Sequence, residues 1–281
     1  MTPTTTGTGS SLLGDLDLAL AIASDAGDLA LSYLHRGVMT LQKGSRDLVS
    51  EADRAVERLI VDRLAEAFPA DFVVGEEGTG GGLSPPADTR CWYVDPIDGT
   101  TNYLKGLPSW GVSIGLADHD GTLLVGVIVL PVSGEVFTAA RGGGARRNGV
   151  PIRCSTEARL ERTLLAHAHS PGSAEQWGGP GALTAATAGL MGQVLGTRLQ
   201  GCSVADLASV AMGRIDATFA GGMSPWDVAA GLLIAAEAGA RITTPDGRTS
   251  VGPDSAFLAS SHGVHEALRA VLAQHGAIPE G

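Results

Sequence analysis

The sequence predicts an α+β protein, in which helices and short strands alternate without the strict strand–helix–strand rhythm of a simple parallel sheet. Two patterns support this prediction. Apolar residues recur at steps of three and four in several segments, as in amphipathic helices, and short apolar runs bounded by glycine or acidic residues are typical of strands. With 281 residues, of which 44% are hydrophobic, the chain is long enough to bury a large core.

The helices are predicted from this spacing and from residues that begin or end a helix. Segment 15–34 has the apolar spacing of an amphipathic helix. A second helix is expected to begin near Ser50 and to end at Pro69, and Ser224 followed by Pro225 marks another helix start. Further helices are expected at 204–212, 225–238 and 265–274.

The strands are predicted from apolar runs that end at turn residues. They are expected at 72–74, 91–94, 111–117, 123–130, 135–139, 215–219 and 256–260. Turns at Asp120–Gly121 and Ser133–Gly134 join three of them into an antiparallel meander. Asp95 is expected to close the strand 91–94.

The meander ends near 149–155, which is the only boundary that the sequence indicates. We therefore expect a flexible tail at 1–14 and one domain at 15–281. Its two subdomains would be roughly 15–150 and 151–281.

Composition narrows the classes of function. The formal net charge of −11 disfavours nucleic acid as a partner. The three cysteines Cys91, Cys154 and Cys202 form no C-x-x-C pair, which argues against a disulfide framework or a zinc knuckle and fits a reducing cytosol. No apolar run is long enough to cross a bilayer, and the first residues lack the features of a secretory signal. We expect a cytoplasmic protein with no membrane partner.

Acidic residues stand at three strand ends or helix starts, in the strings GEE at 75–77, DPIDGTTN at 95–102 and WDVAAG at 226–231. Pro96 keeps Asp95 extended and a turn follows, so Asp95 and Asp98 are expected to converge. Carboxylates in near contact repel each other, and a divalent cation relieves that repulsion. Oxygen ligands without cysteine or histidine suit Mg²⁺ rather than zinc, and the Ile97 carbonyl would add another oxygen.

A phosphate site is expected immediately after these carboxylates. Gly99 leads into a helix start, where free backbone N–H groups bind phosphate oxygens. Asp227 would lie in the first turn of the helix that begins at Pro225, with its carboxylate free to reach a metal.

Each of these residues also has a plain structural explanation. Asp227 would complement a helix dipole, and Asp95 and Asp98 would be turn formers. Asp53 would be half of a capping box with Ser50. Glu76, Glu77 and Lys43 would be solvated surface charges.

Taken together, the three strings, in this order and at these separations, resemble the inositol monophosphatase family. The resemblance runs from about 41 to 259. The wider superfamily includes fructose-1,6-bisphosphatases and histidinol-phosphate phosphatases. The resemblance implies a layered α-β-α-β-α sandwich, commonly a homodimer, that is sensitive to Li⁺. It also implies Mg²⁺-dependent hydrolysis of a small phosphate monoester by direct attack of metal-activated water, with two or three metals per site.

The resemblance also assigns roles to the two subdomains, with 15–150 binding metal and phosphate and 151–281 on the substrate side. It assigns roles to single residues as well. Ligands of the first metal would be Glu76, Asp95 and the Ile97 carbonyl, and ligands of the second would be Asp95, Asp98 and Asp227. The residues implied in catalysis are Glu76, Thr100, Asp53, which would orient Thr100, and Lys43. The residues implied in binding phosphate or substrate are Gly99, Thr100, Thr101, Gly201, Cys202 and Ser203.

One position departs from the family's pattern. Members that act on inositol phosphate usually carry a glutamate a few residues before the WD pair, and this chain has Ala220 there. Loss of such a buried polar contact weakens discrimination among polyols. Inositol monophosphate is therefore the first expectation for the substrate. Histidinol phosphate and a sugar bisphosphate such as fructose 1,6-bisphosphate remain alternatives, as does a non-catalytic binding or scaffold protein on the same fold.

Overall fold

The computed structural model of the chain describes residues 12–36, 40–42, 48–78, 80, 85–167, 179–221, 223–249 and 256–275. The helices are α1 (Leu12–Arg36), α2 (Glu51–Ala67), α3 (Thr100–Leu104), α4 (Pro180–Met191), α5 (Ser203–Ala211), α6 (Pro225–Glu237) and α7 (His265–Gln274), with a short 3₁₀ helix at Leu160–Arg162. The strands of the first half are β1 (Thr40–Gln42), β2 (Leu48–Ser50), β3 (Phe72–Gly75), β4 (Cys91–Asp98), β5 (Gly111–Ala117), β6 (Leu123–Leu130), β7 (Glu135–Ala140), β8 (Ala145–Arg147) and β9 (Val150–Pro151). Those of the second half are β10 (Leu164–His167), β11 (Gly196–Arg198), β12 (Ala217–Ala220), β13 (Arg241–Thr243) and β14 (Phe257–Ser260).

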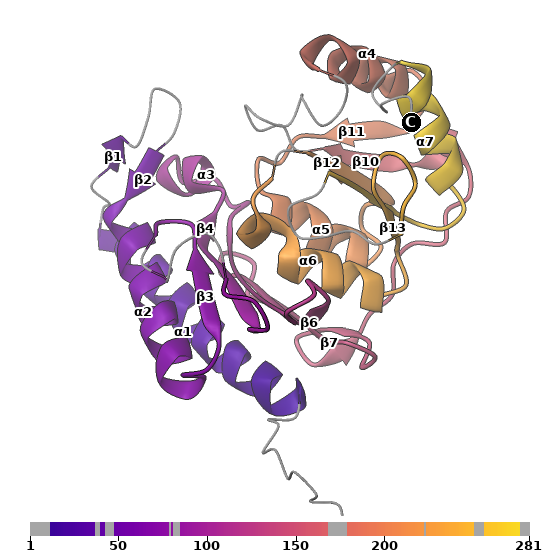
Figure 1. The fold of residues 1–281 in the computed structure, drawn as a ribbon. Coiled ribbons are helices and arrows are strands. Elements are labelled where there is room, and N and C mark those ends of the chain that lie inside the picture. The colour runs from indigo at the N-terminus through magenta and orange to yellow at the C-terminus, as the bar shows by residue number, and fades with distance from the viewer. Residues whose placement is uncertain are drawn as a thin grey trace, which may run out of the picture.

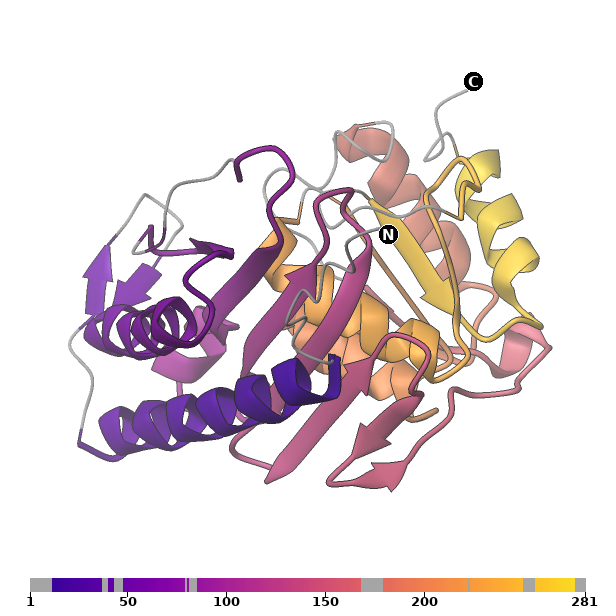
Figure 2. The same ribbon diagram turned by 60° about the horizontal axis from the view of Figure 1, so that its bottom comes forward.

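The larger sheet runs in sequence order from β3 to β9. β3 and β4 are parallel, and each following pair of neighbouring strands, from β4–β5 to β8–β9, is antiparallel. The predicted meander corresponds to β5, β6 and β7. Helices α1 and α2 lie side by side on one face of this sheet and bury their apolar sides against it (Figure 1; Figure 2).

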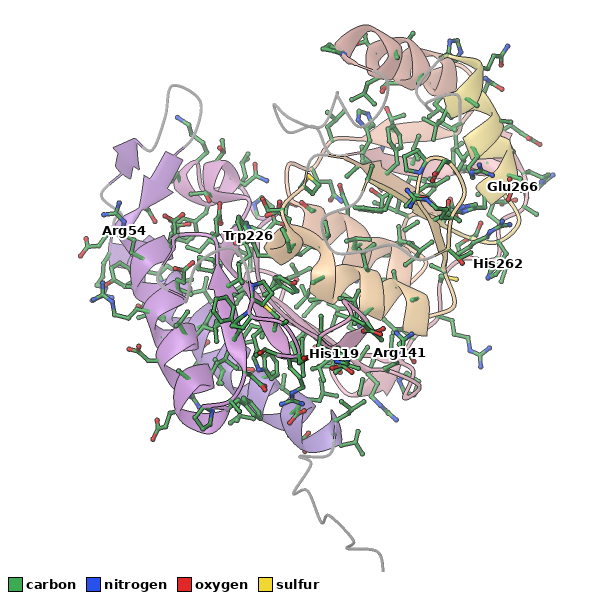
Figure 3. The ribbon with its side chains drawn as sticks, viewed as in Figure 1. Arg54, His119, Arg141, Trp226, His262 and Glu266 are labelled. Atoms are coloured by element: carbon green, nitrogen blue, oxygen red, sulfur yellow. The ribbon has the colours of Figure 1, made fainter. Side chains whose placement is uncertain are left out.

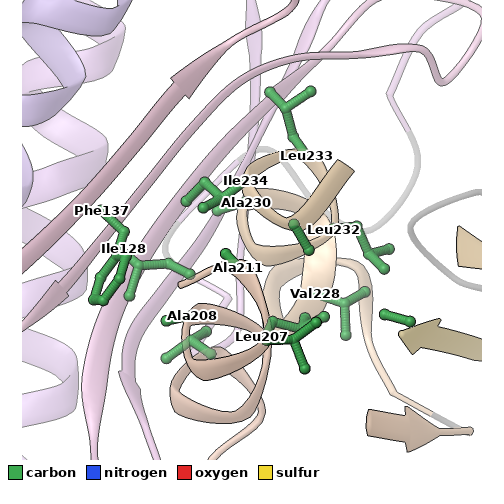
Figure 4. Close-up of a cluster of buried hydrophobic side chains, with 14 of the residues drawn as sticks. Ile128, Phe137, Leu207, Ala208, Ala211, Val228, Ala230, Leu232, Leu233 and Ile234 are labelled. Carbon is green, nitrogen blue, oxygen red and sulfur yellow. The ribbon is translucent and has the colours of Figure 1, made fainter. Parts of the chain in front are cut away.

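The smaller sheet has the order β11-β10-β12-β14-β13, with β11, β10 and β12 parallel to one another. Helices α4 and α7 pack on one face of it. Helices α5 and α6 lie between the two sheets, and their apolar side chains fill that space (Figure 4). The layers therefore alternate as α-β-α-β-α, and the expected fold is confirmed.

Small residues allow the central layer to approach the larger sheet closely. A Cβ on Gly126 of β6 would lie 2.7 Å from the carbonyl oxygen of Ala230 in α6, and one on Gly115 of β5 would lie 2.9 Å from the Cβ of Ala229. Within the central layer itself, a Cβ on Gly231 of α6 would lie 2.6 Å from Leu207 Cδ1 of α5. The abundance of glycine, 40 residues in all, is in part a packing requirement.

Most predicted elements are present, with two differences. The strand 91–94 does not end at Asp95, because β4 continues to Asp98 through an irregularity in its pairing with β5 between Asp95 and Asp98. Such a bulge redirects side chains without ending the strand, and the turn comes only at Gly99, where φ is 88°. The sequence also left several short elements without a prediction, namely α4, the 3₁₀ helix, β1, β2, β8, β9, β10, β11 and β13.

No helix among the described segments is long and apolar enough to span a bilayer. The thiols of the three cysteines are free. The division into subdomains near residue 150 stays a prediction.

Candidate active site

Four carboxylates from distant parts of the sequence lie near one another, around the end of β4. Glu76 follows β3, which runs parallel to β4, and its N–H donates to the carbonyl of Val94 at 3.2 Å. Asp95 and Asp98 are carried by β4 itself. The fourth, Asp227, comes from the first turn of α6.

A hydrogen bond from β5 holds the start of α6 against β4. Asp95 pairs with Ser113 in the ladder between β4 and β5. The Ser113 hydroxyl donates to the carbonyl of Trp226 at 3.2 Å. Trp226, which is labelled in Figure 3, directly precedes Asp227, so this bond holds the first turn of α6 beside the ladder of β4 and β5.

The electrostatics confirm that these acids are neighbours. Burial raises the pKa of Asp95 well above its ordinary value, and the charges of Glu76, Asp98 and Asp227 raise it further. Burial, and then the charge of Asp227, raises the pKa of Asp98 to about 7. Burial raises the pKa of Asp227 to about 6. Neighbouring acids thus oppose the ionisation of Asp95 and Asp98, and positive charge among them would relieve this opposition.

Backbone donors orient three of the carboxylates. The N–H of Ile97 donates to Asp95 Oδ1 at 3.0 Å, and the N–H of Ser224 donates to Asp227 Oδ2 at 2.8 Å. Asp98 Oδ2 accepts from the N–H of Val204 in the first turn of α5 at 2.6 Å. Each of these aspartates is therefore fixed by its own loop or by a neighbouring helix start.

As placed, no group of three or more His, Cys, Asp or Glu side chains within the described part of the chain is arranged to hold a metal ion. The chemistry of the acids nonetheless fits Mg²⁺, because the cluster offers several carboxylate oxygens and neighbouring acids oppose the ionisation of the buried Asp95. The ligand roles of Glu76, Asp95, Asp98 and Asp227, and that of the Ile97 carbonyl, stay predictions.

Thr100 lies beside this cluster, at the start of α3. Its hydroxyl is 3.1 Å from the carbonyl oxygen of Ile97 and 3.3 Å from Asp53 Oδ1. Both of these oxygens act as acceptors, so the single hydroxyl hydrogen is shared between them. Asp53 is fully buried on α2, and its other oxygen accepts from the backbone N–H of Ser50 at 2.8 Å. The capping box predicted at Ser50 is present, so Asp53 both caps α2 and contacts Thr100.

The loop after β4 is docked onto the start of α5. A Cβ on Gly99 would lie 3.2 Å from the carbonyl oxygen of Gly201 and 3.3 Å from the Cβ of Cys202. The amide of Asn102 donates to the carbonyls of Ser109 at 2.6 Å and of Gln200 at 2.7 Å. These contacts bring together the predicted phosphate-binding and substrate-side segments.

The remaining candidate residues are placed as follows. Thr101 is exposed at the start of α3, whereas Cys202 and Ser203 are almost fully buried at the start of α5. Ala220 is buried at the end of β12, where it pairs with Phe257. Lys43 lies outside the described residues, so its role stays a prediction.

Two buried acids near the site have no role in the sequence-based predictions. Glu57 is fully buried on α2, and the N–H of Glu77 donates to its Oε2 at 2.7 Å. Asp206 is buried on α5 and accepts from the amide of Gln200 at 2.6 Å. The spacing of Glu57, one helical turn after Asp53 on the same face of α2, was a signal that could have revealed it.

Solved structures share this layered fold over nearly the whole chain. An inositol monophosphatase from Anabaena (Nostoc) sp. superposes with a TM-score of 0.81 at 33% identity, covering 94% of this chain and 97% of that one. The extragenic suppressor protein suhB from Bartonella henselae superposes with a TM-score of 0.83 at 32% identity, covering 92% and 98%. The fold is that of the inositol monophosphatase class.

Sequence comparison gives the family. The model of the inositol monophosphatase family matches residues 15–277. Nus factor SuhB of Pseudomonas aeruginosa is 38% identical over 230 residues, 81% of this chain and 84% of that protein. Inositol monophosphatase 2 of Solanum lycopersicum is 37% identical over 241 residues, 83% of this chain and 88% of that protein. The chain belongs to the inositol monophosphatase family.

Proposed function

We propose that this protein hydrolyses a small phosphate monoester with the help of Mg²⁺, and that inositol monophosphate is the preferred substrate. The observation that carries the proposal is the cluster of Glu76, Asp95, Asp98 and Asp227, in which the other three acids raise the pKa of the buried Asp95, beside the hydroxyl of Thr100. Family membership supports it, because relatives and structural neighbours are named inositol monophosphatases.

In this proposal the four carboxylates and the Ile97 carbonyl hold the cations, which supply positive charge to the phosphate and lower the pKa of water. Asp53 accepts a hydrogen bond from the Thr100 hydroxyl, so that the Thr100 oxygen can accept a hydrogen bond from the attacking water. Glu76 would take up the single proton that this water loses as it attacks phosphorus. The backbone N–H groups of Gly99 and Thr100 bind phosphate oxygens, and the start of α5 borders the leaving alcohol.

The buried position of Ala220 favours a second candidate substrate. With an alanine methyl in place of a carboxylate, the protein has no acid at this position to select the hydroxyls of inositol. Histidinol phosphate and fructose 1,6-bisphosphate therefore stay open as alternatives within the same chemistry. We further propose a cytoplasmic homodimer, inhibited by Li⁺, that binds neither nucleic acid nor membranes.

The test is phosphate release from a panel of monoesters, each with Mg²⁺ and with EDTA. We expect Mg²⁺-dependent release that is fastest for inositol monophosphate and is inhibited by millimolar Li⁺. A histidinol-phosphate rate well above that for inositol phosphate would replace the substrate, and no release from any monoester would leave a non-catalytic binding protein on the same fold.

A further inference from the structure

A second carboxylate of α2 reaches the turn that carries Glu76. Glu57 is fully buried, and the N–H of Glu77 donates to its Oε2 at 2.7 Å. Burial of a carboxylate is costly unless hydrogen bonds compensate it. The hydrogen bond from the turn therefore compensates part of the cost of burying Glu57, in a region that already holds several negative charges.

Gly75 leaves the space that this contact needs. A Cβ at Gly75 would lie 2.5 Å from Glu57 Oε2 and 2.6 Å from Glu57 Cδ, closer than real Cβ contacts. The glycine of the GEE string thus allows a buried carboxylate to lie directly beside the backbone of the turn.

Two of the hydrogen bonds of the turn tie the backbone around Glu76 to neighbouring elements. Its own N–H donates to the carbonyl of Val94 in β4, and the next N–H along the chain, that of Glu77, donates to Glu57. The backbone of Glu76 is held to the sheet on one side and to α2 on the other. Its side chain then interacts with Asp95.

Asp53 and Glu57 lie one helical turn apart on α2, so both point to the same side of the helix. Asp53 contacts the Thr100 hydroxyl, and Glu57 contacts the turn of Glu76. One helix therefore fixes two separate parts of the site.

We propose that Glu57 is a positioning residue that acts through the backbone of Glu77. It sets the direction in which Glu76 meets Asp95, and thereby the affinity of the site for a divalent cation. This inference rests on the proposed function, because it takes Glu76 as part of the cation site.

The test is Mg²⁺ binding to the full chain, measured by isothermal titration calorimetry without substrate. Glu57→Ala removes the acceptor, and we expect Mg²⁺ binding to weaken about tenfold or more. In Glu57→Gln the side-chain carbonyl can still accept from Glu77, so we expect binding within about threefold of the wild type. The control is Glu66→Ala, an exposed glutamate in the last turn of the same helix, which should bind as the wild type does.

If Glu57→Ala folds poorly, a second variant and the Mg²⁺ dependence of phosphate release test the same role of Glu57. Gly75→Ala crowds the same carboxylate and should weaken Mg²⁺ binding similarly. For Glu57→Ala, the Mg²⁺ concentration for half-maximal phosphate release should rise. The factor by which kcat at saturating Mg²⁺ falls should be much smaller than the factor of that rise.

The inference is overturned if Glu57→Ala and Gly75→Ala lower the melting temperature but bind Mg²⁺ like the wild type, or if Glu57→Gln binds as weakly as Glu57→Ala. A wild type that binds Mg²⁺ but releases no phosphate would refute the proposed function alone, and the calorimetry would still decide the role of Glu57. A wild type that binds no Mg²⁺ would overturn both.

Discussion

At Asp98, burial and the charge of Asp227 raise the pKa to about 7, while the N–H of Val204 at 2.6 Å favours the charged form. Asp98→Asn removes the charge but keeps an oxygen that can accept from Val204. We therefore expect the melting temperature to change by only a few degrees, while kcat for phosphate release falls about 100-fold. Calorimetry and steady-state kinetics at saturating Mg²⁺ measure the two effects, and near wild-type turnover would exclude Asp98 as a ligand.

Asp206 permits a test of stability against pH at a residue outside the predicted ligands. Burial raises its pKa to about 7 from an ordinary value of 3.8. The folded protein holds this proton more tightly than the unfolded chain does, so the stability from this group is full at low pH and is lost as the pH rises from about 4 to about 7.

Asp206→Asn cannot ionise and keeps an acceptor for the amide of Gln200. Relative to the wild type, its free energy of unfolding should rise between pH 4 and pH 8 by more than about 1.4 kcal/mol, which corresponds to one pKa unit. Urea unfolding across this pH range measures the difference. A difference that does not change with pH would mean that Asp206 does not titrate in this way.

At the scale of helices and strands, the elements that could be predicted are those whose own sequence carries a cap or a regular apolar spacing. Helix α2 begins after a serine cap and carries regular apolar spacing, and α7 also has clear periodicity, so both were predictable. In contrast, α4 is rich in alanine, glycine and threonine and buries only Leu183, Ala186 and Leu190, so its sequence carries little periodic signal.

The string DPIDGTTN shows the limit of local reasoning about the site. Aspartate and proline usually mark turns, but β4 continues through them because it lies between β3 and β5 and its ladder absorbs a bulge. The sequence predicted that Asp95 and Asp98 act together. It did not predict that a bulge, rather than a turn, sets their directions.

The contact between β6 and α6 gives a prediction about packing. A Cβ at Gly126 would meet the carbonyl oxygen of Ala230 at 2.7 Å and its Cα at 3.1 Å, both backbone atoms that cannot move aside cheaply. Gly126→Ala should destabilise the protein by about 1–3 kcal/mol in urea unfolding. The control is Gly181→Ala in α4, where a Cβ meets nothing within 4 Å and should stabilise by about 0.5–1 kcal/mol. Equal stability of the two variants would refute close packing between the sheet and α6.

At the scale of the whole molecule, the site depends on layers that local patterns do not describe. Ser113 and Trp226, 113 positions apart, meet because α6 lies between the two sheets with its first turn against β4 and β5. The motif strings identified Glu76, Asp95, Asp98 and Asp227. They gave no role to Glu57 or Asp206, whose contacts depend on the placement of α2 and α5 beside the motifs, although the spacing of Glu57 from Asp53 was a signal in the sequence.

The most direct test of the central claim is a crystal structure of the protein grown with Mn²⁺ in place of Mg²⁺, with anomalous diffraction measured near the manganese edge. We predict at least two anomalous peaks bounded by the carboxylates of Glu76, Asp95, Asp98 and Asp227. Peaks only elsewhere on the molecule, or no peaks at saturating Mn²⁺, would contradict the claim that these acids form a divalent-cation site.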